Sequence, residues 1–133
     1  MKVYITGVAG FLGSHLADAM LSKGYEVSGC DTLLGGYIDN IPSRVNFKQI
    51  DCNDVNQLKT EIKDHEIVYH CAATAYEGLS VFSPHLVTRN IVGATTGVLS
   101  AAISANTCKR FIYCSSMARY GTNDVPFCET MPP

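Results

Sequence analysis

Three glycines near the amino terminus have a spacing that suits the binding of a phosphate group. Gly7 can form a tight turn, Gly10 can let the backbone approach a pyrophosphate, and Gly13 can let a helix pack closely on a strand. An apolar run precedes them and a helical pattern follows, so the first amide groups of that helix would face the phosphates. An ordinary glycine-rich turn is the alternative, but the order strand, loop, helix favours a nucleotide site.

Asp31 is the second residue with a chemical role, because it ends the next predicted strand about 20 residues beyond the glycines. A carboxylate at this place can accept hydrogen bonds from ribose hydroxyls, and it repels a 2′-phosphate. No arginine follows at once to attract such a phosphate, so NAD is favoured over NADP. The alternative is that Asp31 is only a turn residue at the end of a strand.

The elements that would position these residues alternate along the chain. Runs of β-branched and aromatic residues predict strands, and apolar residues at helical spacing predict helices. Strands are expected at 3–6, 26–30, 45–50, 66–70 and 110–114, and helices at about 12–22, 55–62 and 84–105, with a loop at 32–44. This alternation predicts the α/β class and a Rossmann-type doubly wound parallel sheet of strand order 3-2-1-4-5. Residues 1–133 would form one NAD-binding domain, with ligands at the carboxyl ends of the strands.

The charge and the cysteines argue against other kinds of partner. The net charge of −2 offers no basic face for nucleic acid or for a membrane surface, and no apolar stretch is long enough to span a membrane. A secretory signal is also missing, so we expect a cytoplasmic protein. The six cysteines form no C-x-x-C pair and lie mostly in apolar runs. They are expected to be structural thiols, with no metal site.

The glycines follow the pattern G-x-x-G-x-x-G within Thr6-Gly7-x-x-Gly10-Phe11-x-Gly13, and segments 31–36, 70–73 and 109–121 carry further patterns of the same kind. In these segments the sequence resembles the extended short-chain dehydrogenase/reductase family, in particular its NAD-dependent sugar-nucleotide epimerases and dehydratases of the UDP-glucose 4-epimerase type. The resemblance covers essentially the whole chain. It implies NAD as the cofactor and a nucleoside-diphosphate sugar as the substrate.

The resemblance also implies roles for individual residues. The diphosphate loop comprises Gly7, Gly10, Phe11, Leu12 and Gly13, and the ribose ligand is Asp31. The two adenine contacts are Asp51 and Cys52. Four residues lie near the rest of the cofactor: Ala72, Ala73, Asn90 and Ser115. Ser116 matches the catalytic serine, which hydrogen-bonds the sugar oxygen that loses its proton. As alternatives, Asp51 could only begin a helix, Asn90 could cap or cross-link within its helix, and Ser116 could be a turn serine. The segment from Asn90 to Lys109 is a residue or two longer than is usual in the family.

Four other polar residues follow the fourth strand or end it. His70 ends the strand and invites a general-base interpretation, but the family pattern makes this position structural. Tyr76, Glu77 and Ser80 lie in the loop that follows and could meet the substrate. That hypothesis depends on their position alone.

The tyrosine–lysine pair that the family's chemistry needs is not recognisable in this chain. In the family a tyrosine removes the sugar proton, and a lysine four residues later lowers its pKa from the ordinary value near 10. None of the seven tyrosines has a lysine four residues on, and Tyr120 matches a packing tyrosine. We therefore expect this chain to be an amino-terminal fragment, which stops before the pair and before the substrate domain. The full-length protein is expected to be a homodimer. Alone, the fragment is expected to bind NAD weakly, to aggregate through an open fifth strand and exposed apolar helix faces, and to have no turnover.

For the intact protein, the resemblance implies transient oxidation of a nucleoside-diphosphate sugar. NAD takes a hydride, the distal tyrosine takes the proton, and Ser116 stabilises the oxygen. Return of the hydride to the other face gives an epimerase, whereas loss of water first gives a dehydratase. Asp31 and the Tyr120-Gly121 pair after the serines favour a 4-epimerase. The alternatives are a 4,6-dehydratase, an NAD(P)H-dependent reductase of the same family, and a non-catalytic dinucleotide sensor, against which Ser116 argues.

Overall fold

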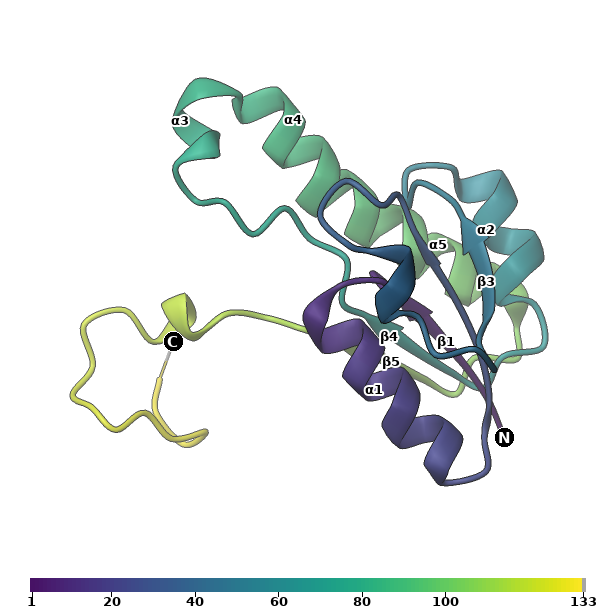
Figure 1. The fold of residues 1–133 in the computed structure, drawn as a ribbon. Helices are drawn as coiled ribbons and strands as arrows, with labels where there is room; N and C mark the ends of the chain where they lie inside the picture. Colours follow the sequence, from purple (N-terminus) through teal and green to yellow (C-terminus); the bar gives the residue numbers. More distant parts are fainter. Residues whose placement is uncertain (133) are drawn as a thin grey trace.

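The computed structural model describes residues 1–132 and contains one parallel sheet of five strands (Figure 1). Its order is β3-β2-β1-β4-β5, which confirms the predicted Rossmann-type topology. The strands are β1 (Lys2–Thr6), β2 (Glu26–Asp31), β3 (Asn46–Gln49), β4 (Ile67–His70) and β5 (Arg110–Tyr113). No end of a strand differs from its predicted position by more than one residue. Small differences of this kind are usual, because the ends of elements are the least certain part of any assignment.

The register of the sheet brings the carboxyl ends of the strands to one edge. Thr6 at the end of β1 is paired with Cys30 of β2 on one side and with His70 of β4 on the other. On β4, His70 is paired in turn with Tyr113 of β5. The loops that leave β1, β2, β4 and β5 therefore start next to one another, as the topology of a ligand-binding α/β sheet requires.

Helices cover the two faces of the sheet and bury two apolar clusters. Figure 1 shows α1 (Phe11–Ser22) on one face, with α2 (Val55–Ile62) and α5 (Ala94–Ala105) on the other. Alternate residues of β1 serve the two faces, as a period of two requires. Val3 and Ile5 pack in the cluster of α1, and Tyr4 packs in the cluster of α2 and α5.

Local sequence signals explain where these helices begin and end. The carboxylate of Asp54 accepts a hydrogen bond of 3.0 Å from Gln57 N, which caps α2. Gly24 follows α1 with a φ of +78°, a conformation that suits glycine at a helix end. Asn106 ends α5 in the left-handed region, where asparagine is the usual substitute for glycine.

The predicted helix at 84–105 forms, but it is not a regular α-helix throughout. Its first part is α4 (Pro84–Thr88), its last part is α5, and a π-helical turn at Arg89–Gly93 joins them. A π turn holds an additional residue within an otherwise continuous helix. Whether this turn is the reason for the extra length expected between Asn90 and Lys109 stays a prediction.

Three sequence expectations need correction. A short helix, α3 (Leu79–Phe82), interrupts the loop expected after β4, and a 3₁₀ turn at Ile38–Asn40 interrupts the loop at 32–44. Neither has a side-chain cap or an apolar period long enough to be seen in the sequence. In addition, the helix at Pro84–Ala105 has 22 residues and is apolar enough to cross a membrane by length and composition alone. The expectation that no stretch is long enough was therefore wrong, although the core helix of a soluble protein passes the same test.

Beyond β5 the chain leaves the body of the domain and folds on itself (Figure 1). Met117–Tyr120 form a 3₁₀ turn, and the ring of Tyr120 stacks on Phe127 with centroids 5.1 Å apart. The stacking agrees with the interpretation of Tyr120 as a packing residue. Among residues 1–132, β5 is hydrogen-bonded to a neighbour on one side only, so it forms an edge of the sheet.

Candidate functional site

The glycine loop between β1 and α1 forms a cradle that has no room for side chains. Gly7 has a φ of +70°, and a Cβ added to it would lie 2.8 Å from Ala72 N. A Cβ on Gly10 would lie 3.2 Å from Gly7 O, and one on Gly13 would overlap the same carbonyl oxygen. Gly7 and Gly13 therefore have the turn and the close packing of helix on strand that their spacing predicted, whereas the approach of a diphosphate to Gly10 stays a prediction.

The start of α1 faces this cradle with its backbone. Gly10 is the N-cap residue, so no side chain caps the helix. The first-turn amides of a helix have no partner within the helix and carry a partial positive charge. The side chains of Phe11 and Leu12 point away from the core, with exposed fractions of 82% and 53%. The helix start thus offers backbone N–H groups to an anion, as a diphosphate site requires.

Asp31 lies beside the cradle at the end of β2. Its Oδ2 accepts a hydrogen bond of 3.1 Å from Ala9 N, and its Oδ1 accepts one of 2.8 Å from Leu33 N. The loop after β2 is also fastened to Ala9, since Tyr37 N and Asn40 Nδ2 both donate to Ala9 O. The carboxylate therefore occupies a fixed place next to the glycine loop, where a nucleoside ribose would follow its diphosphate.

Asp51 and Cys52, after β3, have different surroundings. Asp51 accepts hydrogen bonds from Asn53 through Oδ1 and forms a 2.6 Å ion pair with Arg89 Nη2 through Oδ2. Cys52 is buried in the core under α5, and its carbonyl oxygen lies against Gly97. Asp51 is thus more than a helix-start residue, because it ties the end of β3 to the π turn. The contact of these two residues with adenine stays a prediction.

A directed chain of hydrogen bonds crosses the sheet beneath the site. Thr95 Oγ1 donates to Ile91 O at 2.6 Å, so its oxygen accepts the Nε2–H of His70 at 3.0 Å. His70 Nδ1 then carries no proton and accepts from Thr6 Oγ1 at 2.7 Å. Thr6 Oγ1 in turn accepts from Ala72 N at 3.3 Å. The chain joins β1, the exit of β4 and the π turn, and every donor in it has an acceptor.

His70 is therefore a structural histidine. It is 1% exposed, and burial lowers its pKa to about 4. At neutral pH the ring is uncharged and both of its nitrogens are engaged within the protein. This agrees with the interpretation from the sequence, which set aside a general-base role.

The segment after β4 and the π turn meet above this chain. Ala72 is half-buried against Gly7, and Ala73 is exposed. Asn90, within the π turn, donates from Nδ2 to Thr74 Oγ1 at 3.1 Å. Its side chain therefore holds the segment after β4 and does not cross-link its own helix. This geometry removes the simplest alternative for Asn90 and places it beside the exit of β4.

Ser115 and Ser116 follow β5 and are both exposed. Ser116 Oγ accepts a hydrogen bond of 3.1 Å from Ala118 N and so caps the short turn at Met117–Tyr120. Both serines lie where the chain leaves the body of the domain, and the contacts of Ser116 are local. Tyr76, Glu77 and Ser80 are exposed as well, in and before α3. In the part of the chain that the structure describes, neither the two serines nor the three residues near α3 contact the glycine loop.

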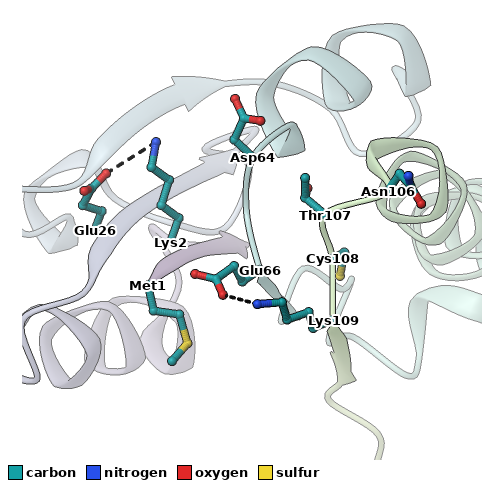
Figure 2. A pocket seen from close by; sticks show the side chains of 9 residues that line it. All are labelled: Met1, Lys2, Glu26, Asp64, Glu66, Asn106, Thr107, Cys108 and Lys109. Atoms are coloured by element: carbon teal, nitrogen blue, oxygen red, sulfur yellow. Dashed lines mark hydrogen bonds and ion pairs between the residues drawn. The ribbon is translucent and has the colours of Figure 1, made fainter.

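A shallow pocket of about 550 Å³ lies at the opposite end of the sheet (Figure 2). Figure 2 shows two ion pairs in its wall, between Lys2 and Glu26 at 3.7 Å and between Lys109 and Glu66 at 2.8 Å. All four charges are neutralised by their partners, and the pocket adjoins the amino ends of the strands. Ligands of open parallel sheets bind at the carboxyl ends, so we do not assign the cofactor to this pocket.

Comparison with known proteins decides the family. The profile of the NAD dependent epimerase/dehydratase family matches residues 3–133. The chain belongs to this family. The resemblance stated from the sequence is thereby confirmed, and NAD is confirmed as the cofactor at the level of the family.

Relatives of this epimerase/dehydratase chain include enzymes of two reaction types. UDP-arabinose 4-epimerase 1 of Arabidopsis thaliana is 35% identical to it over 143 residues, which cover 98% of this chain and 34% of the relative. The structure of UDP-glucose 4-epimerase from Brucella ovis in complex with NAD matches with a TM-score of 0.89 at 33% identity, over 98% of this chain and 41% of that chain. DesIV, a dTDP-glucose 4,6-dehydratase from Streptomyces venezuelae with NAD and TYD bound, matches with a TM-score of 0.87 at 28% identity, over 99% of this chain and 45% of that chain. This chain thus spans less than half the length of each of these relatives.

The site of this family member fits a dinucleotide on its own geometry. The cradle that a Cβ would fill, the uncapped start of α1 and the adjacent Asp31 carboxylate are the three parts that a diphosphate and its ribose need. Within residues 1–132, no group of three His, Cys, Asp or Glu side chains is placed to hold a metal ion.

Sequence analysis missed Thr6, Thr95 and Arg89 as parts of the site. Thr6 and Thr95 act through His70, and Arg89 acts through Asp51. These partners are 25 to 64 residues apart in the chain, so no local pattern reveals them. One signal was available for Thr6, because a polar residue that ends a buried strand requires a hydrogen-bond partner.

Proposed function

We propose that this chain is the NAD-binding part of a sugar-nucleotide 4-epimerase, which acts by transient oxidation of a nucleoside-diphosphate sugar. The observation that carries the proposal is the glycine cradle with the Asp31 carboxylate beside it, 3.1 Å from Ala9 N. A diphosphate suits the cradle, and the diol of a ribose suits the carboxylate. The names of the UDP-arabinose and UDP-glucose relatives support 4-epimerisation.

The residues of this chain would hold the cofactor and the sugar oxygen. The backbone at Phe11 and Leu12 would bind the diphosphate, and Asp31 would bind the adenosine ribose. NAD, once bound, supplies a hydride acceptor that can return the hydride. Because Ser116 Oγ accepts from Ala118 N, its own proton remains available to a sugar oxygen. Such a donor stabilises the oxygen as its proton leaves.

We further propose that residues 1–133 alone bind NAD without turning over a sugar nucleotide. None of their seven tyrosines has a lysine four residues on, and an unassisted tyrosine with a pKa near 10 is a poor base at neutral pH. In the intact protein the tyrosine–lysine pair would come from other residues. The weak NAD binding and the aggregation expected from the sequence belong to the same proposal, which is supported by the β5 edge.

The test is an assay of the intact protein with NAD on UDP-glucose, UDP-arabinose and dTDP-glucose, followed by NMR of the products. We expect a 4-epimer to accumulate with no net formation of NADH. Ser116→Ala should lower kcat by about 10²-fold or more, as loss of an oxyanion donor does elsewhere. Ser104→Ala is the matched control, because this serine is exposed on α5 and donates only to Ser100 O.

Other outcomes of this assay identify the alternatives. A 4-keto-6-deoxy sugar would indicate a 4,6-dehydratase, as the DesIV relative is by name. Net consumption of NADH would indicate a reductase. Binding of NAD with no turnover of any sugar nucleotide would favour a dinucleotide sensor. Failure to bind NAD at all would contradict the proposal as a whole.

The intact protein is also proposed to be a cytoplasmic homodimer. Val92, Leu99 and Ile103 recur at helical spacing on the outer face of the π turn and α5, with exposed fractions of 57%, 40% and 72%. Exposed apolar side chains on one helix face favour a contact with another protein surface. Light scattering of the eluting intact protein would show a dimer mass, and a monomer at micromolar concentration would contradict this part.

A further inference from the structure

Two thiols lie side by side where β4 and β5 end. Cys71 directly follows β4 and Cys114 directly follows β5, and their Sγ atoms are 3.6 Å apart. The strand pairing continues to this point, because Cys114 N donates to His70 O at 3.2 Å. The two cysteines are therefore opposite one another on adjacent parallel strands.

This arrangement is close to that of a disulfide. Adjacent strands run about 4.8 Å apart, and the Cα atoms of disulfide-bonded cysteines are usually about 4.4–6.8 Å apart. The sulfur atoms need to approach from 3.6 Å to about 2.05 Å, and the usual spacing of adjacent strands lies within the range that a disulfide spans. Both cysteines are half-buried, so a small oxidant can reach them.

We propose that Cys71 and Cys114 are a reversible covalent modification site, which a small disulfide oxidant such as oxidised glutathione converts from two thiols into one disulfide. The site does not depend on the proposed function. A bond here would join the residue before Ala72 to the residue before Ser115. It would tie together the two segments at the carboxyl ends of β4 and β5.

The reaction follows ordinary thiol–disulfide exchange in two steps. The thiolate of Cys114 attacks one sulfur of oxidised glutathione, which forms a mixed disulfide and releases one glutathione as a thiol after protonation. The thiolate of Cys71 then attacks the Cys114 sulfur, forms the intramolecular bond and releases the second glutathione. Two protein thiols are oxidised, and one glutathione disulfide is reduced. Burial and the contact with Cys114 raise the pKa of the Cys71 thiol. The two steps balance equally well with the roles of the two cysteines exchanged.

The other cysteines make less suitable pairs. Cys30 and Cys52 are neighbours in the core, but their exposed fractions are 0% and 6%, so an oxidant cannot reach them in the folded protein. Cys108 precedes β5 at the opposite end of the sheet, and Cys128 lies in the exposed segment after β5. Selective bonding of Cys71 to Cys114 is therefore a property of the fold.

The test is to oxidise the folded protein with glutathione disulfide, block free thiols with iodoacetamide, digest with trypsin and identify linked peptides by mass spectrometry. The sequence places each cysteine in a tryptic peptide of its own, with Cys71 in 64–89 and Cys114 in 111–119. We expect a link between these two peptides that dithiothreitol removes. Recovery of both peptides in the alkylated form, or a mixture of links with no preference for this pair, would overturn the proposal.

Three controls keep the result interpretable. Cys114→Ser should abolish the link, whereas Cys128→Ser should leave its yield unchanged. Because a cysteine variant can fold poorly, the wild-type map is decisive by itself, and circular dichroism should check the variants. Oxidation in concentrated urea should remove the preference for this pair. The same preference in the unfolded chain would show that the fold does not direct the bond.

Discussion

Thr6 Oγ1 lies 2.7 Å from His70 Nδ1, and this bond joins the end of β1 to the end of β4 beneath the candidate cofactor site. The bond has a direction, because Thr95 accepts the only ring proton at Nε2. The tautomer of His70 is thereby set by the backbone at Ile91, one of the residues of the π turn. The turn that carries Asn90 and the loop that carries Gly7 are thus held by one chain of hydrogen bonds.

Removal of the Thr95 hydroxyl should therefore destabilise the protein. Thr95→Val keeps the shape of the side chain but leaves the buried Nε2–H of His70 without an acceptor, which costs about 1–3 kcal/mol. Thr96→Val is the matched control, since Thr96 is exposed and its hydroxyl donates only to the carbonyls of Val92 and Gly93. This change should stay within about 0.5 kcal/mol. Urea unfolding of both variants measures the difference, and equal losses would contradict the role given to Thr95.

The stability of the protein should fall as the pH drops through the range in which His70 would ionise if unfolded. Its pKa is about 4 in the folded state and about 6.5 in an unfolded chain. Between these values the unfolded state binds more protons, so acid favours unfolding. The contribution of His70 is fully present above pH 6.5, and about 2 kcal/mol of it is lost between pH 7.5 and pH 5.

A variant isolates this contribution from those of other groups. His70→Gln retains an acceptor and a donor but has no proton to gain in this range. Urea unfolding at pH 7.5 and at pH 5 should therefore show a smaller loss in the variant than in the wild type. Burial also lowers the pKa of His65, so some dependence on pH should persist in both proteins. An identical loss in the two proteins would show that His70 does not titrate as its burial implies.

The sequence predicted the sheet well because local pattern and topology agree along most of the chain. The run Val3–Ile5 of β1 is apolar, which is typical of a strand that is buried on both faces. Asp54 is a typical N-cap residue and marks the start of α2. The π turn was not predicted, since five residues are too few to show a period that differs from that of the flanking α-helix. The short helix α3 gave no signal, because four residues cannot form a stable helix without tertiary contacts.

Some residues of the candidate site could likewise be predicted from the sequence, and others could not. The places of Gly7, Gly10 and Asp31 in the fold could be predicted, because the glycine spacing and a carboxylate at the end of a strand are visible in the sequence. Their contacts with NAD stay predictions. The pairing of Asp51 with Arg89 depends on how two distant segments meet, which only the folded structure reveals. The role of Ser116 stays a prediction, since its contacts within the described residues are local.

The size of residue 10 should control NAD binding more than it controls folding. Gly10 has a negative φ, so Gly10→Ala is not strained by its backbone, but the new Cβ would stand in the cradle 3.2 Å from Gly7 O. We expect NAD affinity to fall by about tenfold or more, with a stability loss near 1 kcal/mol. Gly78→Ala is the control, because open space surrounds that glycine. Isothermal titration measures the affinities, and an unchanged affinity of Gly10→Ala for NAD would place the diphosphate elsewhere.

The charge of Asp31 should decide between NAD and NADP. Asp31→Asn keeps an oxygen that can accept from Ala9 N or Leu33 N, but it removes the negative charge that opposes a 2′-phosphate. Two negative charges about 4 Å apart near a protein surface repel by several kcal/mol at most, and water reduces this figure. We therefore expect the ratio of NADP affinity to NAD affinity to rise by about tenfold, or about 1.4 kcal/mol.

A variant of equal charge separates this local effect from the net charge of the protein. Asp39→Asn removes one negative charge from the same loop, but Asp39 is exposed in the 3₁₀ turn and lies outside the cradle contacts. Its ratio of affinities should stay within about twofold of the wild type, because salt screens charges that are exposed and distant. If both variants change the ratio equally, long-range charge explains the preference. If neither does, the ribose lies away from Asp31, and the preference for NAD must have another source.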